Sequence, residues 1–144
     1  MNAIRLKPGR EKSILQGHPW IFSGALARVD GQPQPGETVS VQSSDGAFLA
    51  WAAYSPQSAI RARVWSDDPE EEVGPALFRR RLTAALRLRE TVLLANEGTA
   101  LRLVHGESDG LPGLVVDRYA DTLVMQVLSA GAEYWRETFA DLLV

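Results

Sequence analysis

The 144-residue sequence contains no cysteine and only two histidines. Disulfides, thiolate metal sites and cysteine nucleophiles are therefore excluded. His18 and His105 lie far apart in the chain, and no third ligand follows either of them at a metal-binding spacing, so we expect no metal site. The first residues contain no apolar signal-peptide core, and no apolar run approaches the length of a membrane span. We expect a protein of the cytoplasm with no membrane partner.

The residues that are present are typical of a globular protein with a packed core. Hydrophobic residues make up 45% of the chain and charged residues 23%, which excludes a disordered class. Residues 1–66 hold seven basic and four acidic residues, for a charge of +3, whereas residues 67–144 hold eight and 14, for −6. The basic first half indicates an anionic partner. Ordinary scatter of surface charge is the alternative.

Turn residues divide residues 1–66 into short strands, which is typical of a small β-barrel or sandwich. Strands are expected at residues 3–7, 18–22, 25–29, 37–42, 47–54 and 59–65, with one or two helical turns within residues 9–16. An acidic segment follows at residues 67–72 and is the expected domain boundary.

The alternation of side chains along these strands predicts a basic outer surface. Successive side chains of a strand point to opposite faces, so the last strand directs Arg61, Arg63 and Trp65 outward together. The first strand likewise directs Arg5 and Lys7 outward. If the two strands lie near each other when the barrel closes, four cations and an indole share a surface suited to RNA phosphates and bases. The alternative is that these residues only occupy the solvent-facing side of edge strands, where lysine and arginine also block aggregation.

Residues 73–144 predict an α+β arrangement with a long helix, a β-hairpin and a C-terminal helix. The long helix begins at Pro75 and runs to about residue 95, with an apolar stripe that contains Phe78, Leu82, Ala85, Leu86, Val92 and Leu93. Arg89 falls inside this stripe, so it must form a pair, snorkel or contradict the helical phase. The last helix, 132–144, ends without a glycine cap or polar tail, which predicts that the polypeptide continues beyond Val144.

The loop and hairpin at residues 105–129 carry the densest pattern. Three glycines and a proline predict a specified turn, which precedes a buried strand at 114–116. The pair Ala120-Asp121 is the expected connection to an antiparallel partner strand at 122–129. The carboxylates of Glu107, Asp109 and Asp117 could bind a cation or orient a substrate. The alternative is turn capping and ion pairing, for instance of Asp117 with Arg118.

A catalytic reading of the same loop rests on His105, Ser108 and Asp109. Three neighbours in one turn rarely converge with triad geometry, so a loop-structural role is favoured. A small hydrolase that uses His105 and Asp109 stays an alternative, as does a stand-alone protein-interaction module.

Several stretches together resemble one protein family. They are Gly9–Leu15, His18–Gly24, Ala53–Pro56, Ile60–Trp65, Gly106–Tyr119 and Leu128–Glu133. They are similar to the S-adenosylmethionine-dependent methyltransferases that methylate C5 of a cytosine in large-subunit ribosomal RNA, and the resemblance runs from about Leu6 to Glu133. It implies a PUA-like pseudo-barrel that binds RNA at residues 1–67 and the start or bulk of a central α+β domain at residues 73–144. The Rossmann-like methyltransferase domain of the family is absent from this chain.

The resemblance also implies a function: the chain is the RNA-recognition portion of such a methyltransferase, with ribosomal RNA as its partner. A thiolate must add to C6 of cytosine before C5 can react, so a chain without cysteine is expected to bind RNA and not to catalyse. S-adenosylmethionine is expected only in the full-length parent.

The residues expected to bind RNA fall into two groups. Those expected to contact phosphate are Arg5, Lys7, Arg10, Lys12, Arg61 and Arg63; those expected to stack or position a base are His18, Trp20 and Trp65. Trp20 and Phe22 form a stacking platform or belong to the core. A homodimer through exposed apolar surface of the central domain is a further expectation. Ala120 stands where relatives usually have glycine.

Overall fold

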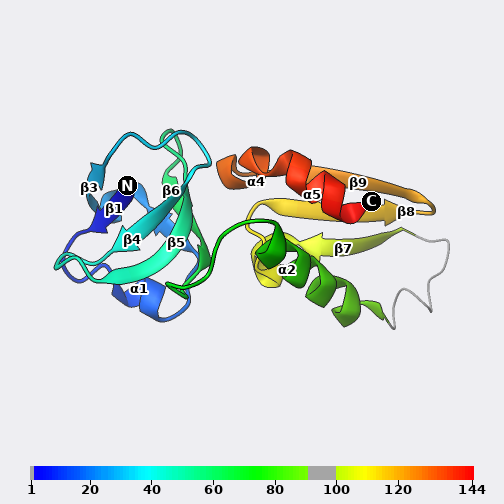
Figure 1. Cartoon of the computed structure of the whole chain (residues 1–144), viewed down its shortest axis with the longest axis horizontal. Helices are drawn as coiled ribbons and strands as arrows, with labels where there is room; N and C mark the ends of the chain where they lie inside the picture. Colours follow the sequence, from blue (N-terminus) through cyan, green and yellow to red (C-terminus); the bar gives the residue numbers. More distant parts are fainter. Residues whose placement is uncertain (1, 91–99) are drawn as a thin grey trace. The chain divides into compact units, whose positions relative to one another are not determined.

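The computed structural model describes residues 2–90 and 100–144. The chain divides into two compact units, Met1–Val73 and Gly74–Val144 (Figure 1). The first unit is a curled sheet with one short helix, and the second is a smaller sheet with helices. This confirms the predicted α+β class.

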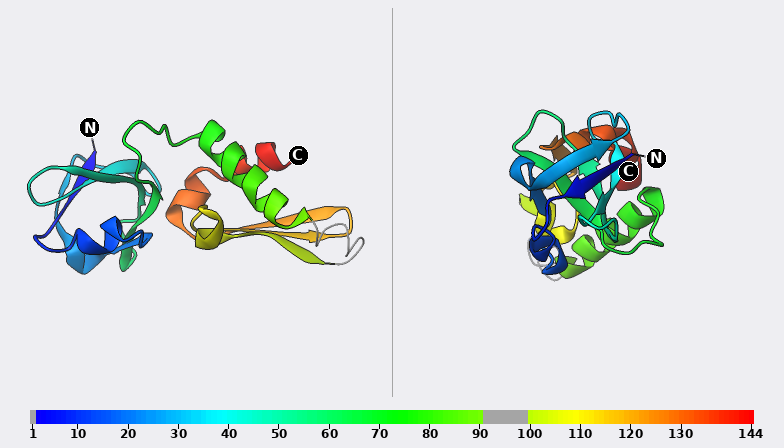
Figure 2. Two further views of the ribbon diagram at one scale, coloured as in Figure 1. Left: turned by 90° about the horizontal axis from the view of Figure 1, so that it is seen from below. Right: turned by 90° about the vertical axis from the view of Figure 1, so that its left-hand side faces the viewer.

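The first unit is a six-stranded sheet that curls into a half-barrel (Figures 1 and 2). Its strands are β1 (Ala3–Leu6), β2 (Trp20–Phe22), β3 (Leu26–Asp30), β4 (Thr38–Gln42), β5 (Phe48–Tyr54) and β6 (Ile60–Ser66). They lie in the order β2-β6-β5-β4-β1-β3, and β1 runs parallel to β4. A single helical turn, α1 (Lys12–Leu15), precedes β2, and the 3-10 turn η1 (Ser23–Ala25) connects the edge strands β2 and β3.

The core of this unit follows from the alternation of β1 and β4. Ile4 and Leu6 on β1, and Val39 and Val41 on β4, are at most 1% exposed. Inward-facing residues of period two meet inside a curled sheet, so the sequence pattern alone defines this core.

Strand β6 contains a β-bulge that the alternation does not predict. Trp51 pairs with Ser66 and Ala52 pairs with Val64, so Trp65 is an extra residue opposite β5. A bulge resets the alternation of side chains beyond it. Trp65 is 2% exposed, so the prediction that its indole is exposed on the surface beside Arg61 is wrong.

The second unit is a three-stranded antiparallel sheet with helices on one face (Figure 2). Its elements are α2 (Pro75–Leu88), β7 (Leu101–His105), the 3-10 turn η2 (Gly106–Asp109), β8 (Leu114–Tyr119), β9 (Thr122–Val127), α4 (Ala130–Tyr134) and α5 (Arg136–Leu143). The strand order is β7-β8-β9. Phe78 of α2 and Phe139 of α5 are both fully buried, with ring centroids 4.7 Å apart.

Two predicted helices differ in extent from those observed. The long helix is observed from Pro75 to Leu88, and the predicted continuation through Val92 and Leu93 lies outside the described residues. The predicted C-terminal helix is instead two helices, α4 and α5, which meet at Trp135. The first begins at Ala130 because the Ser129 hydroxyl caps it by accepting the backbone N–H of Ala132 at 3.1 Å.

Candidate nucleic-acid interface

A cation–π pair lies on the edge of the first unit, where β2 pairs with β6. Trp20 and Arg63 are directly opposite each other in the antiparallel register. The Arg63 guanidinium carbon lies 5.3 Å from the centre of the Trp20 ring. This distance is within the range in which the ring attracts a cation. The pair therefore combines a positive charge and an aromatic surface at one place.

Two further rings extend this edge. The His18 and Phe22 rings lie 6.2 Å from the Trp20 ring. The Trp20 backbone N–H donates to Nδ1 of His18 at 3.2 Å. Nδ1 of His18 also lies 3.3 Å from the Trp20 carbonyl oxygen, so the ring is held against the Trp20 backbone. Phe22 is 49% exposed, so it is not a core residue. It was predicted, with Trp20, to form a stacking platform or belong to the core and was absent from the predicted RNA-binding set, although its period-two spacing from Trp20 places both rings on one face.

A cavity of about 80 Å³ lies beside this edge. Arg10, Ile14, Trp20 and Phe22 are among the residues that line it. The predicted contacts Lys7 and Arg10 come from the segment between β1 and α1, Lys12 is the first residue of α1, and all three are exposed. The structure thus brings Arg10, His18, Trp20 and Arg63 to one edge, with Lys7 and Lys12 in the segment that borders it.

Arg5 and Arg61 make other contacts. The sheet order places β5 and β4 between β6 and β1, so the predicted adjacency of the first and last strands in sequence does not occur. Arg5 donates to the Gln42 side chain at 3.1 Å across β1 and β4. Arg61 donates to the backbone carbonyl of Ser58 at 3.0 Å. The six predicted cations therefore do not form one continuous patch.

The loop after β7 in the second unit contains a hydrogen-bond network that holds the loop in shape, not a hydrolytic site. Asp109 accepts two hydrogen bonds from Arg89, at 3.1 and 2.8 Å, and a third from the backbone N–H of His105 at 2.7 Å. Glu107 accepts the backbone N–H of Gly113 at 2.9 Å. A carboxylate held by an arginine and a backbone amide is poorly placed to orient a histidine for general-base catalysis. The geometry argues against the hydrolase alternative.

Asp117 pairs across the sheet and not with its neighbour in sequence. Arg102 on β7 donates to both carboxylate oxygens of Asp117 on β8, at 2.8 and 3.1 Å. The predicted pairing of Asp117 with Arg118 is wrong, because consecutive residues of a strand point to opposite faces. The hydrogen bond from Arg102 lowers the pKa of Asp117 below its ordinary value of 3.8.

Among residues 2–90 and 100–144, no cluster of three or more metal-binding side chains occurs. None of the helices in this part of the chain is both long and apolar enough to cross a membrane.

The curled sheet and its α1–β2 segment define the class of the first unit. Residues 4–67 match the family model described as PUA-like domain.

Almost the whole chain is related to a methyltransferase family. It is 55% identical over 131 residues to ribosomal RNA large subunit methyltransferase I of Erwinia tasmaniensis and 50% identical over 138 residues to that of Escherichia coli. These matches cover 91% and 96% of this chain but 33% and 35% of the relatives, so the chain spans about a third of their length. The resemblance to this family is confirmed.

A solved structure has the same fold. It is assigned as a SAM-dependent methyltransferase from Streptococcus mutans and matches with a TM-score of 0.83 at 18% identity, covering 99% of this chain and 37% of that one. A second solved structure, described as a methyltransferase complexed with SAH, matches to the same degree.

Proposed function

We propose that this chain is the RNA-recognition portion of a SAM-dependent ribosomal RNA cytosine-C5 methyltransferase. Residues 1–67 are its RNA-binding domain, and residues 73–144 are the start or bulk of its central domain. On its own the chain binds RNA without catalysing methyl transfer. A cytoplasmic location follows from ribosomal RNA as the partner.

The edge formed by Trp20, Arg63 and Phe22 carries this proposal. Phe22 exposes a ring on which an unpaired base can stack, and such stacking is independent of base identity. Arg63 provides a charge for phosphate next to it, and Arg10 adds a second one at the neighbouring cavity. Arg5 and Arg61 then contribute separate phosphate contacts, and the buried Trp65 contributes none.

RNA-binding measurements on two variants test this proposal. Phe22→Ala removes an exposed ring and Arg63→Gln removes the neighbouring charge, and each should weaken binding to a single-stranded ribosomal RNA fragment roughly tenfold. Leu128→Ala, which shortens a side chain 63% exposed in the second unit, is the matched control and should bind as the wild type does. Affinity that is insensitive to both variants and to salt would contradict the proposal.

The absence of catalysis rests on the chemistry of the reaction. No thiolate is available to add to C6 of cytosine, since the chain contains no cysteine. We place S-adenosylmethionine binding in the longer protein and not in this chain. Calorimetric titration of this chain with S-adenosylmethionine should give no binding heat, and measurable methyl transfer to RNA would refute this assignment.

A homodimer through the second unit is the proposed assembly. The edge strand β9 has no charged residue or proline, and its Leu123 and Val124 are each 41% exposed. Unblocked edges of this kind pair with other strands. Val124→Lys should shift a dimer to monomer in sedimentation velocity, whereas Ala140→Lys on the exposed side of α5 should not. A monomeric wild-type chain would refute the dimer and leave RNA binding untouched.

A further inference from the structure

Helix α2 is a basic element within a unit that is close to neutral. Residues 74–144 hold eight arginines and nine carboxylates, and five other carboxylates of the acidic half lie in residues 67–72. The 14 residues of α2 include four arginines, at positions 79, 80, 81 and 87, and no acidic residue. The positive charge of this unit is therefore concentrated on one helix.

The arginines in and after α2 differ in how exposed they are. Arg81 donates to the backbone carbonyl of Gly110 at 2.6 Å, and Arg89 binds Asp109. Both therefore hold the helix to the loop before β8. Arg79, Arg80 and Arg87 are exposed. In the part of the chain that the structure describes, Arg87 makes no ion pair.

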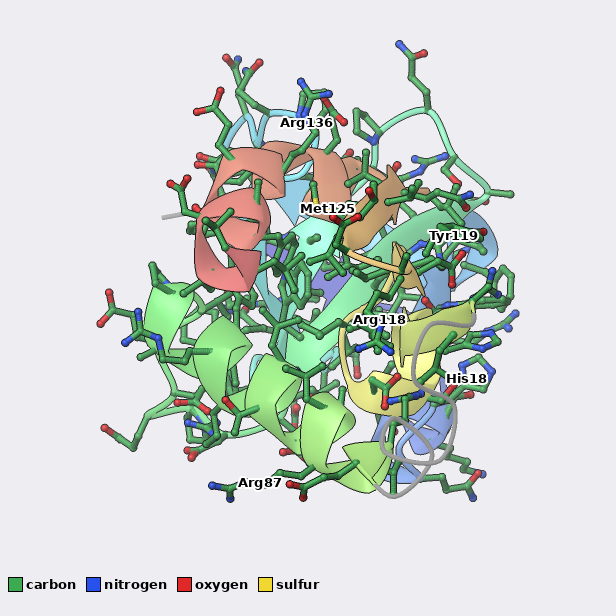
Figure 3. All side chains as sticks on the ribbon, turned by 90° about the vertical axis from the view of Figure 1, so that its right-hand side faces the viewer. His18, Arg87, Arg118, Tyr119, Met125 and Arg136 are labelled. Carbon is green, nitrogen blue, oxygen red and sulfur yellow. The ribbon has the colours of Figure 1, made fainter. Side chains whose placement is uncertain are left out.

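Arg80 and Arg87 share one face of α2. Residues seven apart are two turns apart on a helix, so their Cα atoms are separated by about 10.5 Å along the axis. This separation allows the two side chains to contact different phosphates of one strand. Figure 3 shows Arg87 extending from α2 on the side away from α5. Arg136, at the start of α5, projects on the opposite side.

The surface between these two arginines is open and contains small side chains. Arg80, Thr83, Ala84, Arg87 and Leu88 line a shallow depression. Arginine presents a planar fork of N–H donors that matches phosphate oxygens. A protein partner would instead favour an apolar or aromatic centre, and Leu88 is the one large apolar residue that lines the depression. Leu88 is 76% exposed but stands alone between two arginines, so the charges favour a polyanion.

We propose that the face of α2 formed by Arg80 and Arg87, with Arg79 at its border, is a second RNA contact that binds the phosphate backbone through charge alone. This inference rests on the proposed function, because it adds to an RNA contact already made by the PUA-like domain. Two linked contacts bind more tightly than either alone, since the second forms within one complex. The α2 face supplies affinity, and the β2–β6 edge supplies the contact to bases.

The salt dependence of RNA binding by the whole chain tests this. Arg80→Gln combined with Arg87→Gln removes both charges and keeps helix-forming side chains. Each lost phosphate contact to a single strand lowers the slope of log affinity against log salt by about 0.7, so the double variant should lower it by about 1.4 and weaken binding roughly tenfold at 0.1 M salt. Fluorescence anisotropy with a labelled single-stranded RNA measures both quantities.

Two matched double variants serve as controls. Arg28→Gln with Arg136→Gln removes two exposed arginines that lie outside α2, beside Asp30 and Glu133, and should leave the slope unchanged. Arg80→Lys with Arg87→Lys keeps the charge and should keep the slope, which separates loss of charge from loss of folding.

The possible failures are distinguishable. An unchanged slope in the α2 glutamine variant, while Phe22→Ala and Arg63→Gln still weaken binding, would overturn the α2 contact and leave the proposed function standing. A wild-type chain with no salt-dependent RNA affinity would overturn both. If the α2 variant kept its RNA affinity but lost binding to polyglutamate, the face would serve an acidic protein, and the RNA contact would be overturned.

Discussion

Arg89 and Asp109 form a two-point ion pair that fastens the end of α2 to the loop before β8. The guanidinium donates to both carboxylate oxygens, and the side chains are 19% and 4% exposed. Arg89 also donates to the carbonyl of Ala85 one turn earlier, at 3.0 Å. The arginine that interrupts the apolar stripe of α2 is therefore paired, which was one of the three outcomes that its position allowed.

Removing one partner of this pair should destabilise the second unit. Asp109→Ala leaves a mostly buried guanidinium without its carboxylate and the His105 amide without an acceptor, so we expect a loss of about 3 kcal/mol. Adding Arg89→Ala should cost less than the sum of the single variants, because the unpaired charge is then absent. Urea unfolding followed by circular dichroism measures this. Arg136→Ala, in an exposed pair with Glu133 at 3.6 Å, is the control and should change stability by less than about 0.5 kcal/mol. Strictly additive losses of stability for the Arg89→Ala and Asp109→Ala variants would refute their coupling.

Ala120→Gly should stabilise the hairpin. Ala120 has a φ of 58°, in the left-handed region that costs a residue with a Cβ about 1 kcal/mol relative to glycine. We expect the melting temperature to rise by a few degrees. Ala84→Gly, on the exposed side of α2, is the opposite case and should cost about 1 kcal/mol, because glycine weakens a helix interior. A fall in stability for Ala120→Gly would contradict the expected backbone strain at Ala120.

Gly113→Ala should destabilise the same unit strongly. Gly113 has a φ of 81°, and an added Cβ would lie 2.1 Å from the Ser129 hydroxyl and 2.9 Å from its backbone nitrogen. The left-handed backbone and the clash together should cost about 3 kcal/mol. Gly24→Ala is the control, because nothing lies within 4 Å of its added Cβ. Equal unfolding midpoints for the Gly113→Ala and Gly24→Ala variants would contradict the predicted clash with Ser129.

Acid should weaken the second unit through Asp117. Its pKa is lowered in the folded state by the hydrogen bond from Arg102, so the pair stabilises the fold above the unfolded value of 3.8. This contribution is lost as the pH falls through the lower, folded value. Arg102→Gln should therefore reduce stability at neutral pH and flatten its decline below about pH 4. Arg28→Gln, beside the exposed Asp30, should keep the wild-type profile, and a parallel decline in both variants would contradict this role for Arg102.

Local patterns in the sequence predicted most of the elements. The alternation around Val39 and Val41 defined the core of the first unit, and turn residues marked the strands. The hairpin connection at Ala120-Asp121 is observed as predicted, with Tyr119 opposite Thr122. These features depend on side-chain period and turn chemistry within about ten residues, so no knowledge of distant contacts was needed.

The sequence by itself determined the fold class, the methyltransferase resemblance and the residue types available for RNA binding. The tertiary structure decided which of those residues share a surface. Trp65 is buried, the strand order separates β1 from β6, and the pairing of β7 with β8 places Asp117 beside Arg102. Each of these outcomes depends on strand register and neighbours far apart in the chain, which the period of a single strand does not encode.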